Sequence, residues 1–203
     1  MFAGHFNVTA PQRLFTDDET MRQYTNVPVY VKNRAGEVVE KSMRWGFIPW
    51  NWTGRLKDWT YSSTHARLET VADDDKCFGR AWRLGRRAIF PVGEVFEKGW
   101  AISRRDGGPM AVAGVYDYAM TADGPVLSIA MLTREPDAWM RKIHDREAVI
   151  LNLPMAAQWL NGADDLDLTR PLSQDVYQAV PEAEWRLRSK RQKAGQLDIL
   201  AAE

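Results

Sequence analysis

Cysteine and histidine are scarce in this chain of 203 residues. The single cysteine, Cys77, excludes an internal disulfide and is typical of a protein from a reducing cytoplasm. The three histidines show none of the spacings that zinc sites use, so we expect no metal and no other cofactor. No apolar run is long enough to span a bilayer, and no signal-peptide pattern opens the chain. These absences predict a cytoplasmic protein with no membrane partner.

An excess of charge is also missing, because 27 basic residues balance 27 acidic ones. Nucleic-acid binding would therefore depend on a local basic patch rather than on overall charge. Tryptophan, in contrast, occurs nine times, and its ring serves both in protein cores and as a platform on which bases stack. With an apolar fraction of 45% and no internal repeat, the chain is expected to form one globular domain.

The residue patterns predict more strands than helices. β-branched and aromatic residues indicate strands over residues 27–31 and 38–48, joined by a turn. Apolar segments and turn residues alternate over residues 87–133, which we expect to form an antiparallel meander. A helix is predicted over residues 73–84, and a second one over residues 154–160 with proline in its first turn.

The stretch RRAIFPVGEVFEKGW, residues 86–100, places carboxylates in an apolar strand. Alternation would send Val95 and Glu97 to one face, and Glu94 and Phe96 to the other. A carboxylate among apolar neighbours is costly to bury unless it has partners or a chemical role. The ordinary interpretation is an edge-strand acid that faces water, and the alternative is a catalytic group.

The segment WGFIPWNW, residues 45–52, holds three tryptophans in eight positions. Pro49 ends the strand because it cannot donate to a strand ladder, and this leaves Trp50 and Trp52 on a loop. The two rings form either a hydrophobic lid over the core or an aromatic ledge that stacks on a base.

Three further segments carry candidate binding or catalytic groups. His65 and Arg67 would share one face of an extended segment, where a lone arginine is usually a surface cation. His144, in IHDR, is either a core histidine or a proton carrier. The run WRLRSKRQK, residues 185–193, is either a solvated face or a track for a phosphate backbone.

Five motifs occur in one order: MRWGFIPW, HARLET, RRAIFPVGEVFE, AGVYDY and IHDREAVIL. Together they resemble the SRAP family of SOS-response-associated peptidases or abasic-site processing proteins, whose members show WGLIPxW, NARxET, RRCLVPxxGFYEW and IHxRMPVIL segments. The segment FNVTAPQ is also similar to the start of many members. The resemblance implies an α+β fold, a single domain built on an antiparallel, barrel-like β-sheet with peripheral helices. Residues 1–160 would be the SRAP-like domain, and residues 161–203 a C-terminal segment packed on it.

The resemblance also implies a reaction. Family members are similar in carrying a cysteine directly after the initiator methionine. Its freed α-amine and thiol capture the ring-opened aldehyde of an abasic site in single-stranded DNA, and the resulting crosslink shields the lesion during the response to DNA damage. A glutamate and a histidine move the protons, while an arginine holds phosphate.

Residue by residue, the resemblance assigns roles to positions of this chain. Glu97 stands at the catalytic carboxylate, and His144 stands at the histidine of the last motif. Arg67 stands at the arginine of NAR, where it would contact DNA. Trp50 or Trp52 stands at the aromatic residue that wedges beside the lesion.

This chain departs from the family pattern at several of these positions. Phe2 or Ala3 stands where the family has its cysteine, so neither offers a thiol. His65 replaces the asparagine of NAR, and His5 replaces the arginine of the N-terminal motif. Lys98 replaces the tryptophan that follows the catalytic glutamate.

Three functions therefore stay open, and so does the question of whether the chain is an enzyme. The first is an abasic-site sensor in which an amine alone, such as the Met1 α-amine, attacks the aldehyde and in which Glu97 promotes lyase-type strand cleavage. The second is a degenerate module that binds single-stranded DNA without covalent chemistry. The third is a peptidase or other hydrolase, although no oriented serine or cysteine is apparent and Cys77 lies mid-chain. We expect a monomer that is cytoplasmic, and nucleoid-associated when bound to DNA.

Overall fold

The computed structural model describes residues 20–163, 166–170 and 173–189. The strand expected near the first residue lies outside these ranges, and so do the site candidates Phe2, Ala3 and His5. The last residues of the basic run, 190–193, also lie outside them.

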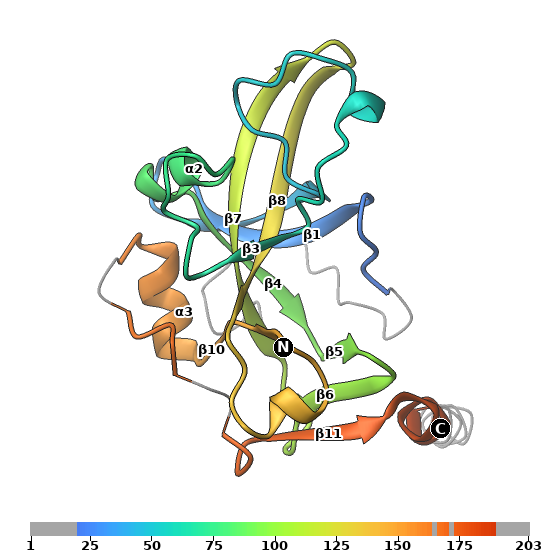
Figure 1. Ribbon diagram of the computed structural model, residues 1–203. Coiled ribbons are helices and arrows are strands. Elements are labelled where there is room, and N and C mark those ends of the chain that lie inside the picture. The colour runs from blue at the N-terminus through green and yellow to red at the C-terminus, as the bar shows by residue number, and fades with distance from the viewer. Residues whose placement is uncertain (1–19, 164–165, 171–172, 190–203) are drawn as a thin grey trace, which may run out of the picture.

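A ring of strands forms the centre of the fold (Figure 1). The strands of this sheet are β1 (Asn26–Lys32), β2 (Val38–Trp45), β3 (His65–Arg67), β4 (Arg87–Val92), β7 (Met110–Thr121), β8 (Gly124–Arg134), β9 (Glu147–Ala148) and β10 (Ile150–Leu151). The ring runs β1, β2, β8, β7, β4 and closes where β4 pairs with β1. β3 and β9 are added along β8, and β10 along β7. The predicted α+β class with a barrel-like sheet is confirmed, although β2 and β3 both pair with β8 in parallel.

A smaller sheet leaves the ring directly after β4. It consists of β5 (Glu94–Glu97), β6 (Trp100–Arg104) and β11 (Tyr177–Pro181), in the order β11, β6, β5. The prediction of one meander over residues 87–133 is therefore wrong for residues 94–104, which form the separate β5–β6 hairpin. The rest of the segment does follow a meander, because β4, β7 and β8 pair antiparallel in that order.

Helices are short and peripheral within the described residues. They are α2 (Gly79–Arg83), α3 (Leu153–Leu160), and the 3₁₀ turns η1 (Leu56–Asp58) and η2 (Met140–Lys142), while residues 182–189 are also helical. α3 begins as predicted, because the Asn152 side chain accepts from the Met155 N–H and proline follows in the first turn. The helix predicted over residues 73–84 is shorter than expected. Residues before Gly79 form successive turns, and a Cβ at Gly79 would lie 2.3 Å from the Asp73 carbonyl oxygen.

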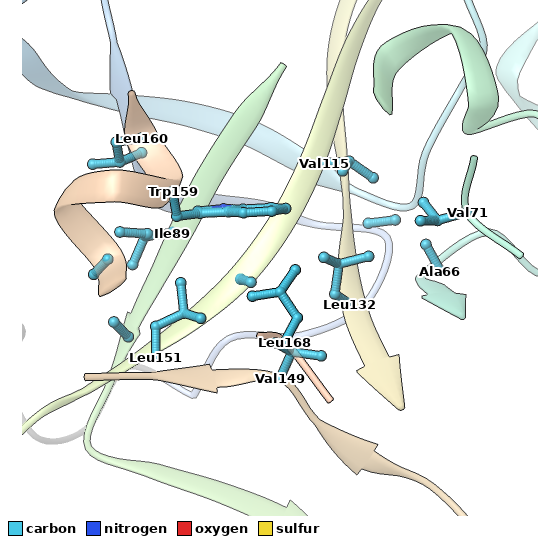
Figure 2. Close-up of a cluster of buried hydrophobic side chains, with 14 of the residues drawn as sticks. Ala66, Val71, Ile89, Val115, Leu132, Val149, Leu151, Trp159, Leu160 and Leu168 are labelled. Atoms are coloured by element: carbon cyan, nitrogen blue, oxygen red, sulfur yellow. The ribbon is translucent and has the colours of Figure 1, made fainter. Parts of the chain in front are cut away.

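Period-two alternation divides the core between the two faces of the ring strands. Val27, Val29 and Val31 of β1 contribute to one buried cluster, whereas Tyr30 contributes to the other. α3 covers the second face, where the fully buried Trp159 donates its ring N–H to the Ala88 carbonyl at 2.9 Å (Figure 2). Burial on both faces explains why β4, with the sequence RAIFPV, is almost continuously apolar.

The long β7–β8 hairpin supports the tryptophan loop beside its tip (Figure 1). The Leu56 N–H donates to Asp123 Oδ2 at 2.7 Å, and the Ala122 N–H donates to the Gly54 carbonyl. At Gly114, a Cβ would lie 2.8 Å from the Phe90 ring, so glycine permits the close approach of β4 and β7.

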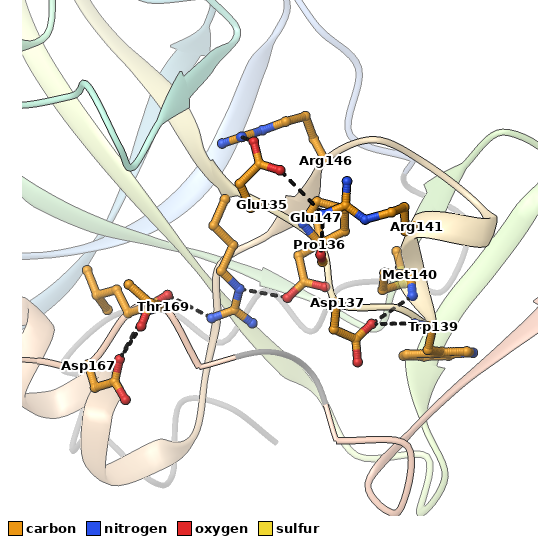
Figure 3. A network of polar contacts seen from close by, with 12 residues as sticks. Glu135, Pro136, Asp137, Trp139, Met140, Arg141, Arg146, Glu147, Asp167 and Thr169 are labelled. Atoms are coloured by element: carbon orange, nitrogen blue, oxygen red, sulfur yellow. Dashed lines mark hydrogen bonds and ion pairs between the residues drawn. The ribbon is translucent and has the colours of Figure 1, made fainter.

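The described part of the C-terminal region contacts the ring and the smaller sheet. Arg134 and Glu147 are a buried ion pair at 2.6 Å, and Arg134 also donates to the Leu168 carbonyl at 2.7 Å (Figure 3). Tyr177 of β11 belongs to the first buried cluster, the one that holds the valines of β1. The division into residues 1–160 and 161–203 stays a proposal.

Candidate active site

Glu97 ends β5, at the edge of the smaller sheet. The alternation of β5 places Glu97 on the same face as Val95, which packs against the first buried cluster. The Glu97 side chain is 25% exposed. Burial raises the pKa of Glu97, Asp145 raises it further, and the charges of His144 and Lys98 lower it. Because burial outweighs the cations, this carboxyl group keeps its proton to a higher pH than an ordinary glutamate does.

His144 follows η2 and faces Glu97. Its Nε2 lies 3.9 Å from Glu97 Oε2, which is longer than a hydrogen bond and is short enough for a small movement or one water to close. The backbone N–H of Arg146 donates to His144 Nδ1 at 3.0 Å. The Arg146 carbonyl oxygen also lies 3.2 Å from Nδ1, so both backbone groups of Arg146 hold this side of the ring, while Nε2 faces the carboxylate. Asp145 Oδ1 lies 3.0 Å from Nδ1, but its side chain is 89% exposed and water screens it.

An ionic clamp formed by Glu69, Arg146 and Glu135 holds the backbone beside His144. Arg146 Nη2 lies 2.6 Å from Glu69 Oε2. Arg146 Nη1 lies 3.0 Å from Glu135 Oε1 (Figure 3). Glu69 also accepts the Glu135 backbone N–H at 2.8 Å. The Arg146 side chain is 14% exposed, so water screens these interactions less than at the surface. The clamp fixes the residue whose N–H orients the imidazole.

His65 lies on β3, next to Met131 of β8. Its Nδ1 lies 3.1 Å from the Thr64 hydroxyl, and its ring meets Trp45 edge-on with centroids 5.9 Å apart. Burial lowers the pKa of His65, and the nearby charge of His144 lowers it further. His65 is therefore a neutral imidazole at physiological pH, and it lies within electrostatic range of His144.

The remaining DNA-binding candidates are more exposed. Arg67 is exposed, and no described carboxylate forms an ion pair with it. Trp50 is 52% exposed and lies under the Arg80 guanidinium, 4.7 Å from ring centroid to Cζ. Trp52 instead packs edge-on against Trp59 at 5.1 Å and is half-buried. Of the two loop tryptophans, Trp50 offers the larger free face.

Asp117 anchors the arginine that stacks on Trp50. Its side chain is fully buried, and it pairs with Arg80 at 3.4 Å and with Arg86. Two guanidinium groups on one carboxylate leave a net positive charge beside the aromatic ring. This combination suits a nucleic-acid strand.

No described interaction joins Cys77 to Glu97 or His144. It packs against the cluster that α3 covers, and burial raises the pKa of its thiol to about 11. The thiol is therefore protonated at neutral pH and is a poor nucleophile.

Two classes of feature are not found in the described ranges. No group of three or more histidine, cysteine, aspartate or glutamate side chains is arranged to hold a metal ion there. No helix in the same ranges combines the length and the apolar character that a membrane crossing requires.

The sequence interpretation missed the clamp and the buried anchor of the aromatic platform. Glu69 occurs in the HARLET motif and Arg146 in the IHDR motif, but a linear pattern does not indicate that the two side chains form an ion pair. Asp117 alternates with apolar residues in AGVYDY, and an acid in such a strand was a signal that could have identified it.

The fold thus combines a closed β-ring, a smaller sheet that carries Glu97 opposite His144, and a loop beside the β7–β8 hairpin in which Trp50 lies against Arg80. The chain belongs to the SRAP family, because the family model described as SOS response associated peptidase (SRAP) matches residues 3–191.

Curated relatives carry names that refer to abasic sites. Abasic site processing protein YoaM of Bacillus subtilis is 30% identical over 142 residues, which are 64% of this chain and 57% of YoaM. Abasic site processing protein YMR114C of Saccharomyces cerevisiae is 31% identical over 125 residues, 58% of this chain and 33% of that protein. The chain thus spans less than two thirds of the length of these relatives.

Solved structures share the fold. A protein from Bordetella bronchiseptica is 25% identical with a TM-score of 0.70, and the match covers 79% of this chain and 85% of that one. A protein from Bacteroides thetaiotaomicron, 21% identical, gives a TM-score of 0.64 and covers 77% and 73%.

Proposed function

We propose that this chain recognises abasic sites in single-stranded DNA and captures the lesion's aldehyde covalently through an amine. The observation that carries this proposal is the pair of Glu97 and His144, with Nε2 and Oε2 3.9 Å apart. Burial raises the pKa of Glu97 toward neutral pH, and this direction favours a group that both gives and takes a proton. Relatives named for abasic-site processing support the choice of substrate.

The surface supplies groups for the DNA strand. Arg67 is exposed on the same strand as His65, and Trp50 with Arg80 forms an aromatic and cationic platform. Phosphates would bind the arginines, and an unpaired base would stack on the tryptophan. We keep as part of the proposal that the protein acts as a monomer in the cytoplasm and on nucleoid DNA.

Borohydride trapping tests the covalent part. The chain is incubated with single-stranded DNA that contains one abasic aldehyde, and borohydride reduces any imine to a stable adduct that is visible on a denaturing gel. Intact DNA of the same sequence is the control. An adduct with abasic DNA alone is expected, and no adduct at any pH would remove covalent capture from the proposal.

A non-covalent DNA-binding module is the second candidate, and the exposed Arg67 and the Trp50–Arg80 platform favour it. It predicts an affinity that falls steeply with salt, with no adduct under any condition. The peptidase activity in the family's name has less support, because no described serine or cysteine hydrogen-bonds to Glu97 or His144.

A further inference from the structure

The acid–base pair has no nucleophile among the groups described so far. Glu97 and His144 can move protons, but neither forms a stable bond to an aldehyde. Cys77, the chain's single thiol, is half-buried and protonated. Capture of an aldehyde therefore needs an amine, and the position next to Glu97 provides one.

Lys98 lies in a tight turn, where its backbone is in the left-handed region. It forms with Gly99 the two-residue turn between β5 and β6, which closes on the pair Glu97 and Trp100. The φ angle of Lys98 is 48°, in the left-handed region that glycine, asparagine or aspartate adopts more readily. Turn chemistry alone does not explain a lysine here. Unfavourable backbone conformations of this kind cluster at functional sites.

The lysine side chain is available and its charge acts on the site. Lys98 is exposed, and no described carboxylate holds it in an ion pair. Its charge nevertheless counts among the interactions that lower the pKa of Glu97, together with that of His144. Lys142 also lies near in sequence, two residues before His144, but its charge is not among the influences on Glu97.

We propose that Lys98 is the amine that attacks the aldehyde of the abasic site, with Glu97 as its proton carrier. The inference rests on the proposed function and names its nucleophile. The Lys98 ammonium transfers a proton to the Glu97 carboxylate, and the free amine forms a bond to the aldehyde carbon. The carbonyl oxygen receives two protons through Glu97 and His144 and leaves as water. Ammonium and aldehyde thus become iminium and water, with no oxidant or reductant required.

Peptide mapping of the trapped adduct tests this assignment. The full chain is reduced with borohydride on abasic single-stranded DNA, digested, and analysed by mass spectrometry for the modified residue. The expected site is Lys98. Lys98→Arg keeps the positive charge and removes the nucleophile, so trapping should fall by about 100-fold or more, while the Kd for the same DNA changes little.

Lys142→Arg is the matched control, because it makes the same change in an exposed lysine two residues before His144. It should leave trapping unchanged. Equal trapping by Lys98→Arg and wild type, or an adduct that maps to the N-terminal α-amine, would overturn the role of Lys98 and leave the proposed function standing. A wild-type chain that binds the DNA but yields no adduct would refute both the lysine and covalent capture.

Discussion

Replacing Glu97 by glutamine separates chemistry from binding and from stability. Glutamine has nearly the same shape and removes both the carboxylate and its proton. Loss of a general acid–base group slows a reaction by about 10²–10⁴-fold, which corresponds to about 3–5 kcal/mol in the barrier. DNA affinity should stay equal or tighten slightly, because one negative charge near the phosphates is lost.

The same substitution should not destabilise the fold at neutral pH. Burial raises the pKa of Glu97 above its unfolded value, although His144 and Lys98 lower it. The folded chain therefore binds more protons than the unfolded chain between these two pKa values, and the free energy of unfolding falls as pH rises through that window. Above it, the folded state carries an ionised carboxylate that burial disfavours. Glu97→Gln removes this cost, so its Tm should exceed that of the wild type at neutral pH and equal it in acid.

Two measurements on the same preparations decide the matter. Borohydride trapping rates give the chemical effect, and thermal unfolding across pH gives the stability effect. Trapping that is equally fast in Glu97→Gln would show that Glu97 carries no proton in the reaction. A variant less stable than the wild type at neutral pH would show that the carboxylate is stabilised by its partners rather than penalised by burial.

Three further substitutions test other parts of the site. Glu69→Gln removes a charge from the ionic clamp and loosens the backbone that orients His144. Trapping should therefore slow by about tenfold and its pH profile should shift, while the Kd for DNA stays unchanged. An unaltered pH profile would mean that the clamp is merely structural. Asp117→Asn leaves the guanidinium of Arg86 without its buried carboxylate partner. The free energy of unfolding, measured by urea denaturation, should fall by about 3 kcal/mol. A fall of less than about 1 kcal/mol would show that water already compensates the charge. Cys77→Ala should leave trapping untouched, and an adduct that disappears would reveal the thiol as a participant after all.

Local strands could be predicted from residue types, but their partners could not. The apolar and β-branched segments over β1 and β2 form the expected hairpin. Residues 87–133 were expected to stay in one sheet, yet residues 94–104 leave it as the β5–β6 hairpin, and β4 pairs with β7 across this insertion. Both arrangements use the same apolar pattern, so the pattern alone does not choose between them.

The helix error has a similar origin. Residues 73–84 carry apolar groups at helical spacing, but the segment from Asp73 to Phe78 folds as consecutive turns and packs Cys77 and Phe78 against the core. Tertiary packing thus outweighs a weak helical preference over this length. α3, with a capping asparagine and proline in place, needed no such correction.

The direction of β3 explains why the clamp forms and why no linear pattern revealed it. β3 runs parallel to β8, with Arg67 next to Thr133, so Glu69 lies beyond the same end of β8 as Glu135. β9 runs antiparallel to β8, with Glu147 next to Arg134, so the residue before it, Arg146, reaches that end from the opposite direction. An antiparallel β3 would carry Glu69 toward the other end of β8 and leave the arginine with one carboxylate. The orientation of the His144 imidazole therefore depends on a strand direction that residue types do not encode.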